Sequence, residues 1–380
     1  MKIVLAPDKF KGSLSAPQVA KAIAAGLRRA DGSVEIDSCP MADGGEGTVT
    51  ALVAATGGSL ETRRVTGPLP EMRVDATFGI LGDGQTAVIE MAAASGLALL
   101  KPADLNPLNT TTFGTGELLM AAAALGMKQI ILGIGGSATV DGGIGCAQAC
   151  GLPVILEGGQ PVSGSEPLCG RDLDSVVLIK HGRGSAIERV RINVACDVTN
   201  PLCGPNGAAA VFGPQKGATS AQIQWLDGAL QRLAQRTGKL AEAATPGAGA
   251  AGGLGFGMLA FFGATLRGGA GVVIEANDLR RRLAGADLCI TGEGRLDAQS
   301  LVGKAPIAVA RLCKEMGITC VGLVGSVGPG AQAAVEQGLR GWFAIDGGNL
   351  PLQDSIDHAP MLLETQAERL MQQLRAGWKP

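Results

Sequence analysis

The residues that could do chemistry gather first in one short segment, TGEGRLD at 291–297, where glycines separate two carboxylates and a guanidinium. The segment follows an apolar stretch at 286–290 that is typical of a buried strand. Carboxylates bind Mg²⁺ or accept a proton, arginine neutralises phosphate, and glycine lets the backbone approach a ligand closely. The segment therefore predicts phosphoryl-transfer chemistry at the carboxyl end of a strand, where open α/β sheets bind ligands.

Two more polar loops follow predicted strands near the N-terminus. Residues 8–13 combine two lysines, a glycine and a serine before a helix expected at about 16–30, which suits either an anion site or an ordinary solvated loop. Residues 42–48 carry Asp43 and Glu46, which could hold Mg²⁺ or substrate hydroxyls. Acidic residues also favour a helix N-terminus for dipole reasons alone, so both interpretations of the second loop stay open.

The middle of the chain carries a glycine-rich loop, GIGGSATVDGG at 133–143, between a predicted strand and a predicted helix. Its first six residues match the dinucleotide pattern G-x-G-x-x-A, and its successive backbone N–H groups could cradle phosphates. The segment 247–252 matches the glycine fingerprint literally, but no strand precedes it. Asp197 is a candidate base or metal ligand, or the start of an Asx turn, and Lys216 is expected on a tight turn.

The elements that must position these loops form two groups. Strands and helices alternate closely near both ends of the chain, which implies parallel βαβ units, whereas the middle mixes short strands and helices. We therefore expect an α/β protein of two domains. A Rossmann- or flavodoxin-like parallel-sheet domain is formed by both chain ends, residues 1–66 plus 280–380. A mixed α/β domain of residues 67–279 is inserted, with the active site in the cleft between the two.

Composition narrows the class of protein. A net charge of −2 and 3% aromatic residues give no case for a nucleic acid or membrane partner, so we expect a small-molecule substrate. Nine cysteines without a C-x-x-C pair fit reduced core thiols in the cytoplasm. Two histidines disfavour histidine-based zinc sites and Ser-His-Asp catalysis. The chain opens on a predicted strand, so we expect no signal peptide, and either a monomer or a homodimer.

Motifs that cover nearly the whole chain in order carry a specific resemblance. They are APDKFKGSLSA (6–16), ADGGEGT (42–48), EMAAASGL (90–97), TTxxGTGEL (110–118), GIGGSATVDGG (133–143), ACDVTNPL (195–202), NGAAAVFGPQKGA (206–218), PGAGAAGG (246–253) and TGEGRLDAQS (291–300). Together they resemble the bacterial type I glycerate kinase family, the glycerate 2-kinases. The resemblance implies ATP-dependent phosphorylation of D-glycerate, typically at the 2-hydroxyl, with ATP and Mg²⁺ as the cofactors. Residues 152–192 show little of the family's pattern.

Within that function we assign roles by residue type. For catalysis we select Lys9, Asp197, Arg295 and Asp297. For the substrate we select Asp8, Lys11, Ser13, Asp43, Glu46 and Lys216. For the nucleotide phosphates we select Gly133, Gly135, Gly136, Ser137, Thr139 and Asp141. For Mg²⁺ we select Asp197, Glu293 and Asp297.

Three alternatives stay open at this point. The phosphate could go to the 3-hydroxyl of glycerate. The G-x-G-x-x-[GA] matches could instead belong to a nicotinamide-dependent oxidoreductase, which needs an acidic residue at the end of the next strand, where Glu157 lies at a suitable distance. The chain could also be a non-catalytic glycerate sensor on a kinase fold.

Overall fold

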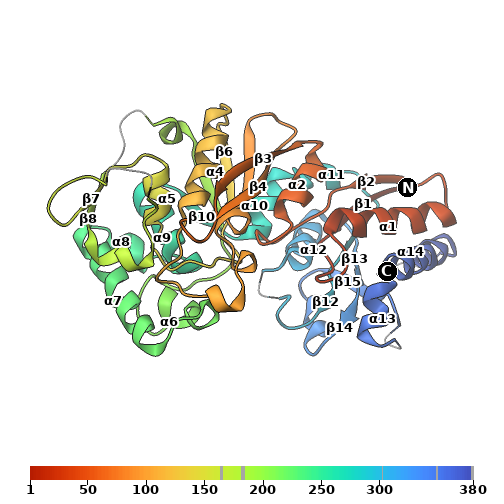
Figure 1. The fold of residues 1–380 in the computed structure, drawn as a ribbon. Coiled ribbons are helices and arrows are strands. Elements are labelled where there is room, and N and C mark those ends of the chain that lie inside the picture. Colours follow the sequence, from red (N-terminus) through yellow and green to blue (C-terminus); the bar gives the residue numbers. More distant parts are fainter. Residues whose placement is uncertain (163–165, 181–184, 302, 348–349, 378–380) are drawn as a thin grey trace. The chain divides into compact units, whose positions relative to one another are not determined.

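Strands and helices alternate along the chain and separate into two units in the computed structural model (Figure 1). The described residues are 1–162, 166–180, 185–301, 303–347 and 350–377. The first unit comprises Met1–Asp43, Thr50–Gly58 and Gly269–Pro380. The second unit comprises Gly44–Val49 and Ser59–Gly268. Helix α2 (Thr48–Thr56) begins in the second unit and ends in the first.

The first unit is built on a five-stranded sheet in which all neighbouring strands are parallel. In spatial order the strands are β2 (Glu35–Ser38), β1 (Lys2–Pro7), β11 (Leu288–Gly292), β13 (Cys320–Val324) and β15 (Leu339–Ala344). Numbered within this unit they run 2-1-3-4-5, which is the flavodoxin-like order. The parallel-sheet α/β fold expected from the two chain ends is therefore confirmed.

Helices pack on this sheet, and its central strands β1, β11 and β13 are predominantly apolar, as expected when both faces of a parallel sheet are covered. The helices are α1 (Ala16–Ala30), α10 (Gly269–Ala276), α11 (Leu279–Leu283), α12 (Ala305–Met316), α13 (Leu352–Asp357), α14 (Ala359–Arg375) and the short 3₁₀ helix η6 (Ala331–Ala334). Helices α1 and α14 lie side by side (Figure 1) and share one apolar core with β1, β11 and β13. Arg29 on α1 pairs with Glu364 and Glu368 on α14. A separate parallel pair, β12 (Arg295–Leu296) and β14 (Ser326–Val327), follows β11 and β13.

The second unit is built on a six-stranded mixed sheet. In spatial order its strands are β3 (Ser59–Thr66), β4 (Arg73–Ile80), β5 (Thr86–Glu90), β6 (Gln129–Gly133), β9 (Arg191–Ala195) and β10 (Thr265–Arg267). Strand β4 runs antiparallel to β3 and β5, and the other neighbouring pairs of this sheet are parallel. The carboxyl ends of the other five strands therefore share one edge of the sheet.

The remaining elements of the second unit surround this sheet and share a large apolar core with it. The α-helices are α3 (Ala92–Ser95), α4 (Phe113–Ala124), α5 (Ile144–Ala149), α6 (Ala208–Phe212), α7 (Ser220–Arg236), α8 (Leu240–Ala244) and α9 (Ala250–Phe262). The 3₁₀ helices are η1 (Leu97–Leu99), η2 (Pro102–Asp104), η3 (Gly170–Ser175), η4 (Ala186–Arg189) and η5 (Pro214–Lys216). Strands β7 (Val154–Leu156) and β8 (Val176–Ile179) form an antiparallel pair of their own.

The units divide at different residues from the domain boundaries expected near 66 and 280. Strand β3 pairs with β4 along its whole length, so residues 59–66 belong to the second unit. Residues 269–279 belong to the first unit, where the side chain of Asn277 donates a hydrogen bond to the carbonyl of Pro40. No helix in the described ranges is both long and apolar enough to span a membrane.

Candidate active site

In the first unit, the topological switch point lies between β1 and β11, where the strand order reverses. Asp8 directly follows β1, and Glu293 directly follows β11. The backbone N–H of Asp8 donates to the carbonyl of Gly292 at 2.8 Å, which ties the two loops together. The segment that the sequence singled out at 291–297 and the Asp8 loop therefore meet where sheets of this order bind ligands.

Asp8 carries a buried carboxylate. Its residue is only 6% exposed. Burial raises the pKa of Asp8 to about 7, and the negative charges of Asp43 and Glu293 add to the shift, while Lys9 opposes it. The Lys9 backbone N–H donates to Asp8 at 2.6 Å, and the Lys9 ammonium lies 3.8 Å from Asp43. A carboxyl group that is half ionised near neutral pH can take a proton from a hydroxyl group.

Glu293 is the second buried acid of this site, and burial is the main cause that raises its pKa. One of its oxygens lies 3.5 Å from the ammonium of Lys304, the residue before α12. Its other oxygen, Oε1, is buried and accepts no hydrogen bond from the described residues. An unpartnered buried carboxylate oxygen is costly unless a proton or cation meets it, so this atom fits a Mg²⁺ ligand.

Arg295 and Asp297 complete the loop after β11. The Arg295 Nε donates to Asp297 Oδ2 at 3.1 Å, and the Gln299 backbone N–H donates to Asp297 Oδ1 at 2.9 Å. Both Asp297 oxygens thus hold the loop itself in shape. The Arg295 side chain is 61% exposed, which leaves the guanidinium available to an anion.

The remaining sequence-selected residues near the N-terminus divide between surface and structure. Lys11 and Glu46 are exposed, and Asp43 is half-buried beside Lys9. The Ser13 hydroxyl, selected for substrate, instead donates to the carbonyl of Ile356 at 2.9 Å. This bond ties the Asp8 loop to the end of α13, so Ser13 has a structural partner that the sequence did not reveal.

In the second unit, the loop at 133–143 follows β6 and its acidic residue lies beneath it. Asp141 is fully buried and accepts hydrogen bonds from the backbone N–H and hydroxyl of Thr112, at 2.8 and 2.7 Å, and from the backbone N–H of Gly143 at 3.1 Å. Asp141 was selected for nucleotide phosphates, but these bonds anchor the loop to the start of α4.

Lys216 also lies beneath this loop. It is 2% exposed, and its ammonium donates to the Ser137 hydroxyl and the Thr139 carbonyl, both at 2.7 Å. Burial lowers the pKa of Lys216 to about 7, and Asp141 opposes the shift. The lysine selected for substrate therefore supports the loop from inside, together with the side chain of Ser137.

The exposed part of the loop is backbone, at Gly135 and Gly136. Gly136 has a φ of +73°, a conformation that L side chains rarely adopt. Gly133 lies where a Cβ atom would come within 2.4 Å of the Gly44 carbonyl oxygen. The loop thus presents backbone, and only backbone, to an approaching anion at its tip.

Neither glycine fingerprint has the structure of a dinucleotide site. After β6 the chain runs ten residues before α5 begins, whereas the fingerprint needs a helix at its third glycine. The second match packs beneath the first: Gly142 donates to the Gly252 carbonyl, and a Cβ at Gly252 would lie 1.8 Å from the Thr139 carbonyl oxygen. Glu157 follows β7, which does not belong to the main sheet.

The residues selected for Mg²⁺ occupy both units. Asp197 follows β9 in the second unit and is exposed, whereas Glu293 and Asp297 follow β11 in the first. Within the described ranges, no three carboxylates bring their oxygens within 4.8 Å of one another. Mg²⁺ usually takes only one or two protein carboxylates and fills its shell with phosphates and water, so a single carboxylate such as that of Glu293 is sufficient.

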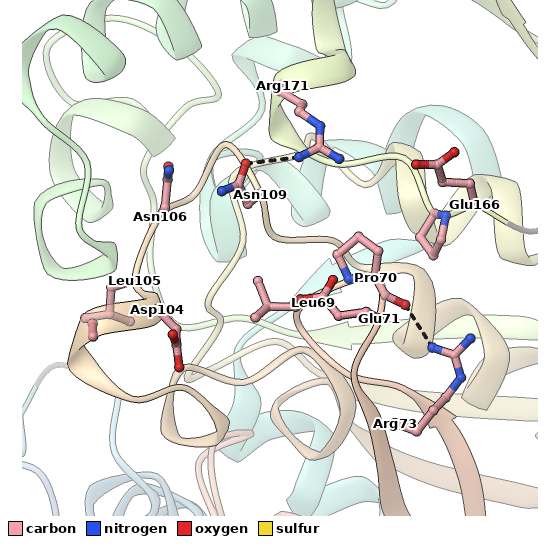
Figure 2. A pocket seen from close by; sticks show the side chains of 12 residues that line it. Leu69, Pro70, Glu71, Arg73, Asp104, Leu105, Asn106, Asn109, Glu166 and Arg171 are labelled. Carbon is pink, nitrogen blue, oxygen red and sulfur yellow. Dashed lines mark hydrogen bonds between the residues drawn. The ribbon is translucent and has the colours of Figure 1, made fainter.

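A pocket of about 820 Å³ opens elsewhere in the second unit (Figure 2). Its walls include the loop that joins β3 to β4 and residues around η2 and η3. Arg171 donates to the Asn109 side chain at 3.1 Å, and Arg73 donates to the Pro70 carbonyl at 2.8 Å (Figure 2). None of the residues selected from the sequence lines this pocket.

Two residues with notable contacts, Lys304 and Glu90, were not predicted as site residues from the sequence. Lys304 pairs with Glu293, and its only sequence signal is a lysine that follows a glycine at a helix start. Glu90, at the end of β5, accepts a hydrogen bond from the backbone N–H of Val49 at 2.8 Å. The motif EMAAASGL marked Glu90, but an acid at a strand end gives no sign of which helix N-terminus it meets.

The first unit has a flavodoxin-like sheet with buried acids at its switch point, and the second α/β unit carries a glycine-rich loop. Together these features indicate an α/β enzyme. The chain matches the glycerate kinase family over residues 3–375 and belongs to that family. It is 46% identical over 371 residues to the glycerate kinase of Bacillus subtilis (strain 168), covering 97% of this chain and 96% of the relative.

Two further similar proteins also carry glycerate kinase names. The glycerate 2-kinase of Escherichia coli (strain K12) is 45% identical over 350 residues, covering 91% of this chain and 90% of the relative. A crystal structure from Salmonella typhimurium LT2, provisionally assigned as glycerate kinase 2, matches with a TM-score of 0.88 at 43% identity. That match covers 99% of both chains. The resemblance noted from the sequence motifs is therefore confirmed.

Proposed function

We propose that the chain transfers the γ-phosphoryl group of ATP to the 2-hydroxyl of D-glycerate, giving 2-phospho-D-glycerate and ADP. The similarity to a protein named glycerate 2-kinase supports the acceptor and the position. The observation that carries the chemistry is the pair of buried acids, Asp8 and Glu293, with raised pKa values at the switch point. Phosphoryl transfer needs a base for the hydroxyl and positive charge for the phosphates, and this site offers both.

Asp8 is the proposed base, in place of the substrate-binding role expected from the sequence. Its pKa of about 7 leaves a large ionised fraction at neutral pH, while its burial keeps it basic enough to accept the hydroxyl proton. Lys9, held beside Asp43, is positioned to bind the carboxylate of glycerate.

Glu293 is the proposed protein ligand of Mg²⁺, through its unpartnered Oε1. When bound, the ion neutralises the charge that develops on the transferring phosphate. Lys304 and the exposed guanidinium of Arg295 supply further positive charge from the same loop region. Asp197 and Asp297 remain candidates for the metal, and Asp297 also orients Arg295.

For the nucleotide phosphates we propose the exposed backbone of Gly135 and Gly136. Successive backbone N–H groups bind anions without any charged side chain. Asp141, Lys216 and the side chain of Ser137 then act indirectly, because they fix the shape of the loop from below.

The deciding experiment is ³¹P NMR of the protein with ATP, Mg²⁺ and D-glycerate. We expect stoichiometric 2-phosphoglycerate and ADP. Their formation should be about 10²–10⁴-fold slower with Asp8→Asn and unchanged with Asp75→Asn, an exposed acid of the second unit. Formation of 3-phosphoglycerate would contradict the 2-hydroxyl. Glycerate binding without ATP consumption would indicate a sensor, and NAD reduction an oxidoreductase.

We further propose a cytoplasmic protein, a monomer or a homodimer, with no nucleic acid partner. All nine cysteines are free thiols, as a reducing compartment requires. The net charge of −2 gives no electrostatic basis for nucleic acid binding.

A further inference from the structure

Three cysteines that are distant in sequence meet inside the first unit. Cys289 on β11 and Cys320 on β13 are directly opposite each other in neighbouring parallel strands, and Cys313 lies on α12. Leu288 and Ile290 face the core shared by α1 and α14, so Cys289 between them points to the opposite face. The three sulfur atoms all lie within 4.8 Å of one another, and all three residues are fully buried.

The three thiols are close enough to interact. The neighbouring thiols of Cys289 and Cys320 lower the pKa of Cys313, so a thiolate forms there most readily. A buried cysteine in a protein core is usually an isolated apolar side chain, whereas these three sulfurs converge on one point.

Charge decides which ligand such a site could take. Within the described ranges, no histidine or carboxylate joins the three sulfurs as a fourth ligand, which disfavours the tetrahedral coordination of Zn²⁺. Three thiolates around a monovalent or divalent ion would leave a net negative charge in an apolar core, which is costly. Around a trivalent centre the same three thiolates give a neutral complex.

We propose that Cys289, Cys313 and Cys320 form a binding site for one trivalent thiophilic metalloid, such as arsenic(III). Arsenous acid would exchange its three hydroxyl groups for the three sulfurs. Three As–S bonds form, each thiol proton leaves with one hydroxide as water, and arsenic stays trivalent. No oxidant or reductant is needed, and the product carries no charge.

The bound centre would cross-link β11, β13 and α12. Strand β11 leads directly to Glu293, and α12 begins directly after Lys304, so the cross-link joins the elements that carry this pair. Because the sulfurs are fully buried, entry requires a local opening of the unit, and we expect uptake to be slow and faster with rising temperature. None of this depends on which substrate the enzyme phosphorylates.

The experiment incubates the full chain with arsenite just below its melting transition, under a phosphine reductant that leaves no competing dithiol. Native mass spectrometry should show the gain of one arsenic atom and the loss of three hydrogens. X-ray absorption at the arsenic edge should show three sulfur neighbours. Cys289→Ala, Cys313→Ala and Cys320→Ala should each lose the adduct. The double variant Cys146→Ala/Cys150→Ala, which removes two buried thiols of the second unit, one on α5 and one just after it, should keep the adduct.

Two results would overturn the proposal without any variant. One is the absence of an adduct after prolonged incubation. The other is an arsenic shell of two sulfurs and one oxygen, because it requires only a pair of thiols. Loss of the adduct in the Cys146/Cys150 variant, with retention in the three single variants, would place the site elsewhere.

Discussion

The two glycine-rich, acidic loops at strand ends look alike in sequence but differ in how their polar groups are satisfied. Beneath the 133–143 loop, Asp141 accepts hydrogen bonds from Thr112 at the start of α4, and Lys216 donates to Ser137 and Thr139 of the loop. Both charged groups are therefore satisfied, and only the neutral hydroxyl of Thr139 has no partner among the described residues. Burial raises the pKa of Asp8 and Glu293 at the switch point of the first unit, as it raises that of Asp141, but Glu293 Oε1 accepts no hydrogen bond from the described residues. A buried carboxylate oxygen without a hydrogen bond is costly to a fold, so Glu293 indicates chemistry, whereas the satisfied oxygens of Asp141 indicate structure.

The largest expected effect is on turnover, in a comparison of Asp8→Asn with Asp141→Asn. Asp8→Asn should reduce turnover by about 10²–10⁴-fold, because it removes the proposed base. It should leave the melting temperature at pH 7 the same or higher. Kinetics on folded protein and calorimetry check both. If Asp141→Asn cost as much turnover per folded molecule as Asp8→Asn, the distinction between the loops would fail.

The pH dependence of stability should reveal Asp8 independently of activity. Its pKa rises from 3.8 to about 7 on folding, so the native state binds more protons than the unfolded state between these pH values. The contribution is therefore fully present below pH 4 and is lost as pH rises through about 7. We expect the free energy of unfolding of Asp8→Asn, relative to wild type, to increase by roughly 2–4 kcal/mol from pH 4 to pH 8. Equal pH profiles in urea titrations would show that Asp8 ionises freely.

Asp141→Asn should have the opposite profile: lower stability and little direct effect on chemistry. An asparagine keeps one acceptor oxygen but turns its amide group toward the N–H of either Thr112 or Gly143, because these donate to different oxygens of Asp141. The buried, unpaired donors should cost about 1–3 kcal/mol. Urea denaturation measures this loss, and turnover corrected for the folded fraction should stay close to wild type.

Local signals predicted elements well, and long-range partners limited the rest. Helix α1 was expected at about 16–30 and spans Ala16–Ala30, because its start is encoded nearby: the Ser15 backbone N–H donates to Gln18. By contrast, Ser13 meets the carbonyl of Ile356 from the far end of the chain. Whether an acid faces a ligand or supports a loop depends on such partners, which spacing in the sequence does not reveal.

The glycines also depend on long-range partners, because some of them expose backbone whereas others allow two chain segments to pack closely. Gly135 and Gly136 leave backbone exposed, whereas Gly252 and Gly142 let two segments pack backbone against backbone. Both patterns match a phosphate-binding motif in sequence. Only the three-dimensional packing separates the glycines that approach a ligand from those that approach another chain segment.

The smallest expected effect tests the proposed phosphate loop with two glycines of matched backbone conformation. Gly136 has a φ of +73° and Gly126, at the end of α4, has a φ of +81° with nothing near its missing side chain. Alanine should cost about 1–2 kcal/mol of stability at either position, because both require a left-handed backbone. Of these two variants, only Gly136→Ala should also raise the KM for ATP more than the KM for glycerate, since Gly126 is not part of the backbone proposed to bind phosphate. Gly135→Ala, which needs no left-handed conformation, should raise the KM for ATP with little loss of stability. If Gly135→Ala and Gly136→Ala left both KM values unchanged, the backbone of the 133–143 loop would not bind phosphate. Every group of that loop would then be structural, in contrast to the acids at the switch point of the first unit.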